Sequence, residues 1–412
     1  MNKLSAVGII AEYNPFHNGH KYHLDKAMEM SGADCAVVVM SGDFVQRGEP
    51  AIFDKWERAR IAVECGADLV LELPFAFACN NAGAFARGGV GVLAGLGCIT
   101  HLAFGSETGN IVMIEEMSRL LSHEDAKLSS MIKDKLALGV SYPRARYEAI
   151  KDFRPDLVDA LGQPNDILAV EYLKEIYRIG SSIQPLAIRR FGAAYDDENL
   201  RPGISGATAI RKAVQRGDIA GIRDSVPEVT WNVLKESCGT EARQTRLYEL
   251  LRYKLLSEAT ESFEEVYSIS EGLNNKLVKE IIKSSDLLDF IDRMKSKRYT
   301  RTRIQRVIIH TLMNLSDADY KSFETRSCLY ARVLGFSKNG AKLLRHIKRN
   351  ELASIPVLTN INKEMIEEGE REKLLMYDIR SADVYNLISN NELYKYSDKV
   401  RKPFLLNEHC DR

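Results

Sequence analysis

The sequence predicts an α/β protein, with a doubly wound parallel sheet in the amino-terminal half and a mainly helical domain after it. Up to residue 190, short apolar runs alternate with helical patterns, which is typical of such a sheet. Beyond residue 203 strand signals weaken, and charged segments with helical Leu/Ile spacing predominate. A chain of 412 residues also exceeds the roughly 250 to 300 that one core serves. We therefore expect two domains, 1–215 and 216–412.

The first half of the sheet domain has a regular order of elements. Residues 4–11 form a short apolar run that Pro15 and Gly19 close, which predicts a buried strand, and 20–30 follows as a helix. The next expected elements are a strand at 35–40, a helix at 53–65, a strand at 69–73, a helix rich in small residues at 81–96 and a strand at 99–104. This order is Rossmann-like.

The remaining elements are more local. We expect one long helix over 111–138, a helix over 166–179 with Asn165 or Asp166 as its N-cap, and a last strand over 183–190. Near the carboxyl terminus, 354–358 and 382–387 are expected as short strands around a helix at 363–373.

The composition excludes several classes of protein. Basic and acidic residues balance at 57 each, and no apolar run approaches the roughly 20 residues of a membrane span. The seven cysteines are scattered without a C-x-x-C pair, so we expect neither a disulfide framework nor a zinc site, and we assign no residue as a metal ligand. The start of the chain lacks the pattern of a signal peptide. We expect a cytoplasmic protein.

One motif carries chemistry. Residues 14–20 read Asn-Pro-Phe-His-Asn-Gly-His at a strand-to-helix turn, where carboxyl ends of strands meet a helix N-terminus. His17 and His20 can face one phosphate cluster there, and Gly19 lets the backbone approach it. Nucleotidyl transfer mainly requires positioning and neutralisation of charge. Two nearby histidines are often an ordinary surface turn, but the complete motif after a strand favours ATP chemistry.

Residues 12–20 resemble the ATP-binding signature of HIGH-type nucleotidyltransferases, and the longer string through His23 is similar to the bacterial tRNA(Met) cytidine acetate ligase family. Four further segments stand in that family's order: 40–50 (MSGDFVQRGEP), 104–107 (FGSE), 164–168 (PNDIL) and 207–211 (ATAIR). The resemblance implies a sheet domain of the HIGH nucleotidyltransferase type.

The resemblance also implies a reaction. Acetate and ATP, the latter with Mg²⁺, would give an enzyme-bound acetyl-adenylate, without acetyl-CoA. The acetyl group would then pass to N4 of the wobble cytidine of elongator methionine tRNA, giving N4-acetylcytidine.

The same resemblance implies a set of ATP-binding residues. The nucleotide loop would comprise Ile10, Ala11, Glu12, Tyr13, Asn14, Pro15, Phe16, His17, Asn18, Gly19, His20, Lys21, Tyr22 and His23. Gly105, Asn165 and Thr208 would complete the site, with Arg189 or Arg190, since strand alternation lets one of the two enter the cleft. His17, His20 and Arg211 would be catalytic.

Two loops near these residues are less clear. Gly206 stands where the superfamily pattern has a serine, which puts a role for Ser205 in doubt. Residues 46–50 form a polar loop that would line the acetate or cytidine pocket, with Arg47 as its best candidate, or else lie in solvent.

Two basic clusters in the second half are candidates for binding RNA. The first comprises Lys295, Lys297, Arg298, Arg301, Arg303 and Arg306, with Tyr299 among them. The second comprises Lys338, Lys342, Arg345, Lys348 and Arg349, of which all but Lys348 share one helix face. Either cluster alone is usually a solvated face, but two clusters beside an ATP motif favour tRNA binding. Tyr299 would stack on a base or, more ordinarily, pack between helices.

Two other functions stay open at this point. A small-molecule adenylyltransferase of the nicotinate or pantetheine-phosphate type shares the histidine motif but usually has a much shorter chain. A non-catalytic RNA-binding protein on a nucleotide-binding fold is disfavoured by the intact His17, Gly19, His20 and Arg211.

Overall fold

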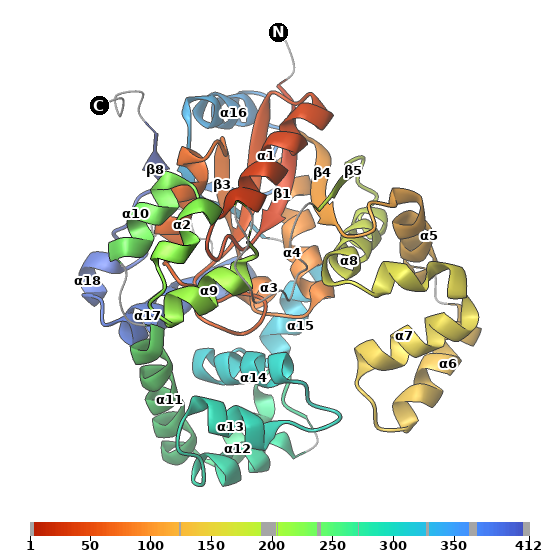
Figure 1. Cartoon of the computed structure of the whole chain (residues 1–412), viewed down its shortest axis with the longest axis vertical. Helices are drawn as coiled ribbons and strands as arrows, with labels where there is room; N and C mark the ends of the chain where they lie inside the picture. The colour runs from red at the N-terminus through yellow and green to blue at the C-terminus, as the bar shows by residue number, and fades with distance from the viewer. Residues whose placement is uncertain are drawn as a thin grey trace.

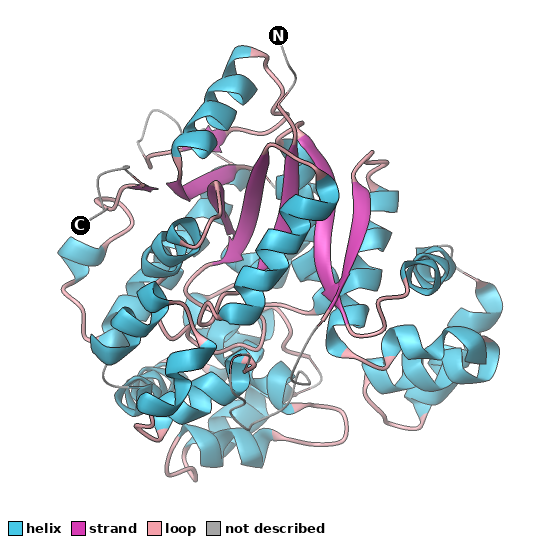
Figure 2. Cartoon of the chain, turned by 45° about the horizontal axis from the view of Figure 1, so that its top comes forward, coloured by secondary structure: helices cyan, strands magenta, loops and turns pink. Residues whose placement is uncertain are grey.

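The structure is a computed structural model that describes residues 4–122, 125–190, 203, 205–236, 240–270, 272–326, 329–361 and 369–406. Its centre is one eight-stranded sheet with helices on both faces (Figures 1 and 2). The strand order is β5-β4-β1-β2-β3-β6-β7, and β8 pairs with β6.

The first five strands are parallel and confirm the predicted doubly wound sheet. They are β1 (Ala6–Ala11), β2 (Cys35–Ser41), β3 (Leu69–Leu73), β4 (Ile99–Ser106) and β5 (Gln184–Arg189). Every residue of β2 and β3 is buried. Because both faces of a parallel sheet are covered, such strands appear in the sequence as continuous apolar runs.

Helices of the first half cover both faces. On one face lie α1 (Asn18–Ser31) and α2 (Lys55–Glu64), and on the other α3 (Phe75–Ala78), α4 (Ala82–Gly95) and α8 (Pro164–Arg178). The small residues of α4 allow close packing: a Cβ added at Gly88 would lie 2.5 Å from Phe77, and one at Gly89 would lie 2.6 Å from Ile10. The helix expected at 81–96 is thus confirmed, and its small residues allow this close approach.

The expected long helix at 111–138 is wrong. The chain forms α5 (Ile111–Ser122) and α6 (Ala126–Ala137), followed by α7 (Tyr142–Phe153) and the 3-10 helix η1 (Pro155–Leu161). Asp125 accepts a hydrogen bond of 2.9 Å from the main-chain N–H of Leu128, so it caps a new helix. The expected caps Asn165 and Asp166 lie in the first turn of α8, and Gln163 is its N-cap. Figure 1 shows α6 and α7 projecting beside the sheet.

The helical character predicted after residue 203 is confirmed for the next hundred residues. The helices are α9 (Ala207–Gln215), α10 (Glu228–Glu236), α11 (Thr240–Ser257), α12 (Leu273–Ile281), α13 (Leu287–Met294), α14 (Arg301–Met313) and α15 (Asp317–Arg326), with 3-10 helices η2 (Ala220–Ser225) and η3 (Thr260–Glu265). The helices α11 to α14 gather below the sheet in Figure 1.

The carboxyl-terminal part returns to the sheet: the strand expected at 354–358 is confirmed at residues 357–358, whereas the other two strands of this part were not predicted. Strand β6 (Ala331–Phe336) pairs antiparallel with β3, and β7 (Val357–Leu358) and β8 (Phe404–Leu405) pair with β6. The helices of this part are α16 (Lys338–Arg349), α17 (Glu370–Ser389) and α18 (Leu393–Tyr396). The expected strand at 382–387 is wrong, because it lies inside α17; most of the expected helix at 363–373 lies outside the described residues. The sheet therefore crosses the predicted boundary at residue 215.

A buried group of charges joins the carboxyl-terminal part of the chain to the sheet. Lys55 Nζ lies 2.7 Å from Glu72 and 2.5 Å from Asp398, and Arg332 lies 2.9 and 2.7 Å from the same two carboxylates. Burial would raise the pKa of Asp398, but Arg332 and Lys55 outweigh it and hold that pKa at about 2. The two cations and two anions thus satisfy one another between strands β3 and β6 and the chain after α18.

No helix in the described ranges is both long enough and apolar enough to cross a bilayer.

Candidate active site

A cleft of about 1430 Å³, including its open mouth, lies at the carboxyl ends of β1, β4 and β5. The loop between β1 and α1 forms its floor and has an unusual backbone, with φ of 48° at Tyr13 and a cis peptide bond at Asn14–Pro15. Asn14 Oδ1 accepts a hydrogen bond of 2.8 Å from the Ile52 N–H, and buried Arg58 donates one of 2.7 Å to the Glu12 carbonyl. The loop is therefore held in shape from below.

His17 and His20 stack face to face at the start of α1. Their ring centroids lie 3.7 Å apart at an interplanar angle of 20°. The His17 N–H donates to His20 Nδ1 at 3.3 Å, which leaves Nε2 of a neutral His20 as its N–H donor. Within the described part of the chain, the buried atoms His17 Nδ1 and His23 Nε2 have no hydrogen-bond partner. An ordered water or a ligand in the cleft would satisfy these two nitrogens.

The histidines are neutral at physiological pH. Burial, followed by the positive charges of Arg190 and Arg211, lowers the pKa of His17 to about 3. Burial and Arg190 likewise lower the pKa of His23 to about 4, and burial with neighbouring His17 lowers that of His20 well below 6.5. The site thus offers neutral imidazoles beside two permanent cations.

The side of the cleft near β4 is held by carboxylates. Glu107 accepts hydrogen bonds from the Asn165 side-chain amide and, at 3.2 Å, from the Asp166 N–H. Buried Asp166 in turn accepts from the Ser106 hydroxyl and, at 3.1 Å, from the Thr108 N–H. These contacts fix Asn165 at the start of α8, facing the cleft.

Both Arg189 and Arg190 line the cleft, but the Arg190 side chain lies over Gly105 and its charge acts on His17, whereas the Arg189 side chain lies against Gly109. The Arg190 N–H donates to the Ser106 carbonyl at 2.9 Å. A Cβ at position 105 would lie 3.3 Å from Arg190 Cγ, so Gly105 leaves room for this side chain.

The opposite wall comes from α9. Arg211 donates to the Asn14 carbonyl at 2.8 Å and to Thr208 Oγ1 at 3.4 Å. Gly206, which replaces the expected serine, is the N-cap of α9 and lines the cleft with Ser205. The hydroxyls of Ser205 and Ser225 lie 2.9 Å apart in a hydrogen bond, so Ser205 is present in the wall but already engaged.

Most residues predicted for ATP binding or catalysis line this cleft. They are Ile10, Ala11, Glu12, Tyr13, Asn14, His17, Gly19, His20, Tyr22, His23, Gly105, Asn165, Arg189, Arg190, Thr208 and Arg211. Four predicted members do not: Pro15 and Phe16 are buried in the floor, Asn18 donates to the carbonyls of Gly203 and Asp224, and Lys21 pairs with Asp25 at 2.5 Å. Pro15, Phe16 and Asn18 shape the loop, whereas the Lys21 pair lies on the surface of α1.

Sequence reasoning missed the apolar wall, which consists of Ile9, Phe85, Phe104, Leu168, Tyr172 and Ile188. Leu168 and Tyr172 follow Asn165 by three and seven residues, so helical spacing alone was a signal for them. For Phe85 the sequence contains no such signal, because this residue reaches the cleft from a separate helix. Gln46 and Arg47 also line the cleft, as one of the two interpretations of the polar loop expected.

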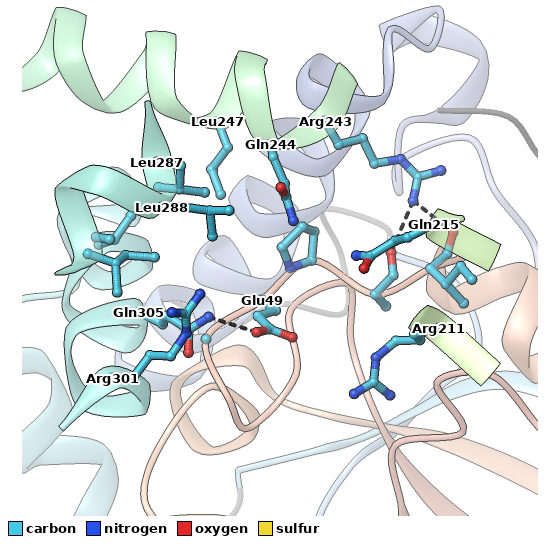
Figure 3. A pocket seen from close by; sticks show the side chains of 16 residues that line it. Glu49, Arg211, Gln215, Arg243, Gln244, Leu247, Leu287, Leu288, Arg301 and Gln305 are labelled. Carbon is cyan, nitrogen blue, oxygen red and sulfur yellow. Dashed lines mark hydrogen bonds between the residues drawn. The ribbon is translucent and has the colours of Figure 1, made fainter. Parts of the chain in front are cut away.

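A second pocket of about 840 Å³ adjoins the cleft, and Arg211 lines both. Figure 3 shows it between the loop after β2, α9 and the helices α11, α13 and α14. It is lined by Gly48, Glu49, Pro50, Ala51, Ile52, Arg211, Gln215, Arg243, Gln244, Leu247, Leu287, Leu288, Ile291, Arg301, Gln305 and Ile308.

The first basic cluster surrounds the start of α14. Lys295, Lys297, Arg298 and Arg301 are exposed there, and Lys295 and Arg301 contact Asp292. The Arg303 guanidinium lies 4.7 Å from the centre of the Tyr299 ring. Arg306 turns inward instead, toward the carbonyls of Gln46 and Asn80 at 3.3 and 3.5 Å. It connects α14 to the cleft rather than facing solvent with the others.

The second cluster lies on α16, where Lys338, Lys342, Arg345, Lys348 and Arg349 are all exposed. Ser337, the N-cap of this helix, donates to Asp68 at 2.7 Å, and Asp68 immediately precedes β3. The helix thus sits at the amino ends of the parallel strands, whereas the cleft sits at their carboxyl ends; Figure 1 shows α16 and α14 at opposite ends of the molecule. The structure does not bring the two clusters together.

Comparisons with known proteins identify the family of this chain. A family model described as HIGH nucleotidyl transferase matches residues 4–399. The tRNA(Met) cytidine acetate ligase of Clostridium perfringens is 37% identical over 98% of this chain and 100% of its own length. That of Caldicellulosiruptor saccharolyticus is 39% identical, covering 95% and 96%.

Solved structures agree as well. The ligand-free form I of Thermotoga maritima TmcAL superposes with a TM-score of 0.91 at 31% identity, covering 98% of this chain and 100% of that one. The same protein bound with alpha-thio ATP gives a TM-score of 0.88 with the same coverage. The chain therefore belongs to the HIGH nucleotidyl transferases and, within them, to the tRNA(Met) cytidine acetate ligase family.

Proposed function

We propose that this protein is an ATP-dependent ligase that acetylates N4 of the wobble cytidine in elongator methionine tRNA. The observation that carries the proposal is the stacked, neutral His17 and His20 pair beside Arg190 and Arg211, in a chain that matches acetate ligases over nearly its whole length. A neutral N–H donor and guanidinium groups suit a triphosphate whose charge shifts during reaction.

The cleft suits ATP. Buried nitrogens of His17 and His23 lack partners among the described residues, and a triphosphate offers acceptors or, through water, donors to them. The apolar wall of Phe85, Leu168 and Tyr172 is suited to an adenine ring, which Asn165 would orient. Mg²⁺ would arrive with ATP, held by phosphate oxygens and water. Arg47, in the polar loop at the cleft, is our candidate partner for the acetate carboxylate.

The reaction has two steps. A carboxylate oxygen of acetate attacks the α-phosphorus, an O–P bond forms, and diphosphate leaves with the electrons of the broken bond. Then N4 of cytidine attacks the acetyl carbon, the C–N bond forms, AMP leaves, and one proton is released. The chain's residues position groups and stabilise charge; neither step requires a covalent acyl-enzyme or acetyl-CoA.

The test uses purified protein with ATP, Mg²⁺ and labelled acetate. We expect acetate-dependent exchange of diphosphate into ATP, and label in N4-acetylcytidine when methionine tRNA is added. Label from acetyl-CoA but not from acetate would contradict the proposal. Exchange that depends on nicotinate mononucleotide or phosphopantetheine would instead indicate the small-molecule adenylyltransferase.

A further inference from the structure

We propose that the second pocket receives the cytosine that is acetylated, turned out of the RNA, and that Glu49 recognises its exocyclic amine. This inference rests on the proposed function and assigns the acceptor site that the function requires. Enzymes that act on a base commonly extrude it into a pocket that holds its faces and hydrogen-bonds its edge.

The position of the pocket is the first support. Arg211 lines both the cleft and the second pocket, and its guanidinium donates to the Asn14 carbonyl beside the histidines. A base in the second pocket and a nucleotide in the cleft would therefore meet across one side chain. The amine must reach the activated acetyl group, and Arg211 is the residue that the two linings share.

The apolar lining is the second support. Leu247, Leu287, Ile291 and Ile308 are buried, whereas Leu288 is 48% exposed at the pocket. Figure 3 shows Leu247, Leu287 and Leu288 together on one side of the pocket. An exposed leucine at the edge of a buried apolar wall provides a surface on which a flat ring can rest.

The polar side of the pocket is the third support. Gln305 on α14 donates from its Nε2 to Glu49 Oε1 at 2.7 Å, which orients the carboxylate (Figure 3). Within the described residues, the second carboxylate oxygen of Glu49 has no side-chain partner. At position 4 of its ring, cytosine has an amine, which can donate a hydrogen bond to a carboxylate oxygen. Uracil has a carbonyl oxygen at the same position, which a carboxylate repels. The pocket thus has the chemistry to select cytosine.

The rim has the charge that an RNA backbone requires. Arg243 donates to the carbonyls of Ala51 and Ile52 at 3.2 and 2.7 Å, which secures the loop that carries Glu49. Arg301 is exposed at the rim and belongs to the first basic cluster, so this cluster borders the pocket. Phosphate contacts from such a cluster would position the RNA, and the pocket would read the base.

The first experiment measures binding of methionine tRNA with cytidine or uridine at the wobble position, without acetate. We expect wild-type protein to prefer cytidine about tenfold or more. Glu49→Gln should lose most of that preference by binding the uridine tRNA better, because an amide can donate to the uracil oxygen. Damage to the fold cannot produce such a gain. Glu249→Gln, an exposed glutamate on α11, should behave as wild type.

The second experiment separates the two steps. Leu288→Asp should reduce acetyl transfer to tRNA at least tenfold and leave acetate-dependent diphosphate exchange within about twofold. Ile282→Asp is the matched control, since Ile282 is also exposed, at 63%, but does not line the pocket. Loss of exchange together with transfer would overturn the inference.

The outcomes also separate this inference from the proposed function. If wild-type protein acetylates tRNA but binds the two tRNAs equally, or Glu49→Gln leaves their ratio unchanged, the pocket assignment fails alone. If no tRNA is acetylated but Glu49 still governs the choice of base, the pocket stands and the proposed reaction fails.

Discussion

The guanidinium of Arg211 donates a 2.8 Å hydrogen bond to the main-chain oxygen of Asn14, which joins α9 to the loop between β1 and α1. The same group also contacts Thr208. Arg211→Lys keeps the charge but loses the forked geometry that makes both contacts. We expect acetate-dependent diphosphate exchange to fall at least tenfold. Arg216→Lys, exposed at the end of the same helix, is the control, and equal rates for both variants would contradict this role.

His20→Ala removes one ring of the stacked pair and its N–H donor. Loss of one donor that stabilises a charged transition state typically costs about 10²- to 10³-fold in rate. We expect a loss of this size in diphosphate exchange, measured with acetate and without tRNA. His346→Ala on α16, at the other end of the sheet, should retain full activity. If tRNA binding rather than exchange falls in His20→Ala, the assignment of the cleft to ATP is wrong.

The stability of the protein should decrease below about pH 6.5 because of the buried histidines. His17 is 7% exposed, and burial with nearby arginines lowers its pKa to about 3, whereas an unfolded histidine titrates near 6.5. Between these values the unfolded state binds more protons, so acid favours unfolding. At pH 5 this effect is about 2 kcal/mol for one such histidine.

Urea unfolding of wild type and His17→Asn at pH 7.5 and 5.0 measures the effect. We expect the wild type to lose about 2 kcal/mol more than the variant between these conditions. The comparison needs the variant because Asp43 and Asp378, whose pKa values burial raises to about 7, act in the opposite direction. Equal losses would show that His17 is not held neutral.

Asp398→Asn breaks the buried group of charges between the sheet and the chain after α18. Lys55 and Arg332 would then face Glu72 without their second anion, and uncompensated buried charge typically costs about 3 to 5 kcal/mol. We expect a decrease of this order in the free energy of unfolding. Asp156→Asn, which affects an exposed pair with Arg154, should change it by less than about 1 kcal/mol. Similar values for both variants would refute the importance of the buried group.

The parallel strands and the histidine motif were predictable because they are local. Residues 35–40 are a continuous apolar run, residues 69–73 are apolar except for Glu72, and the strand before His17 could be recognised from a few residues. Strand β6 was missed because its pairing with β3 joins residues about 260 positions apart. The segment 382–387 has apolar residues that suit a strand or a buried helix, and the core packing of α17 decides for the helix.

In the candidate site, too, local features were predictable and contacts between distant segments were not. Residues 10–23 form a continuous stretch, and most of them line the cleft. The second pocket draws on five separate segments, from Gly48 to Ile308, which no spacing rule connects. The sequence predicts Arg306 as a member of a basic cluster, yet its side chain contacts the carbonyls of Gln46 and Asn80. The course of α14, rather than the residue type, decides which way this side chain points.

Strand β6 follows β3 by about 260 residues, which has a consequence for folding during synthesis. Until β6 has left the ribosome, β3 is the open edge of a parallel sheet, with unpaired backbone groups and apolar side chains. A nascent chain in that state is exposed to aggregation, and chaperones act on such intermediates. Premature termination after residue 320 would yield a product with an intact histidine loop and an unprotected sheet edge.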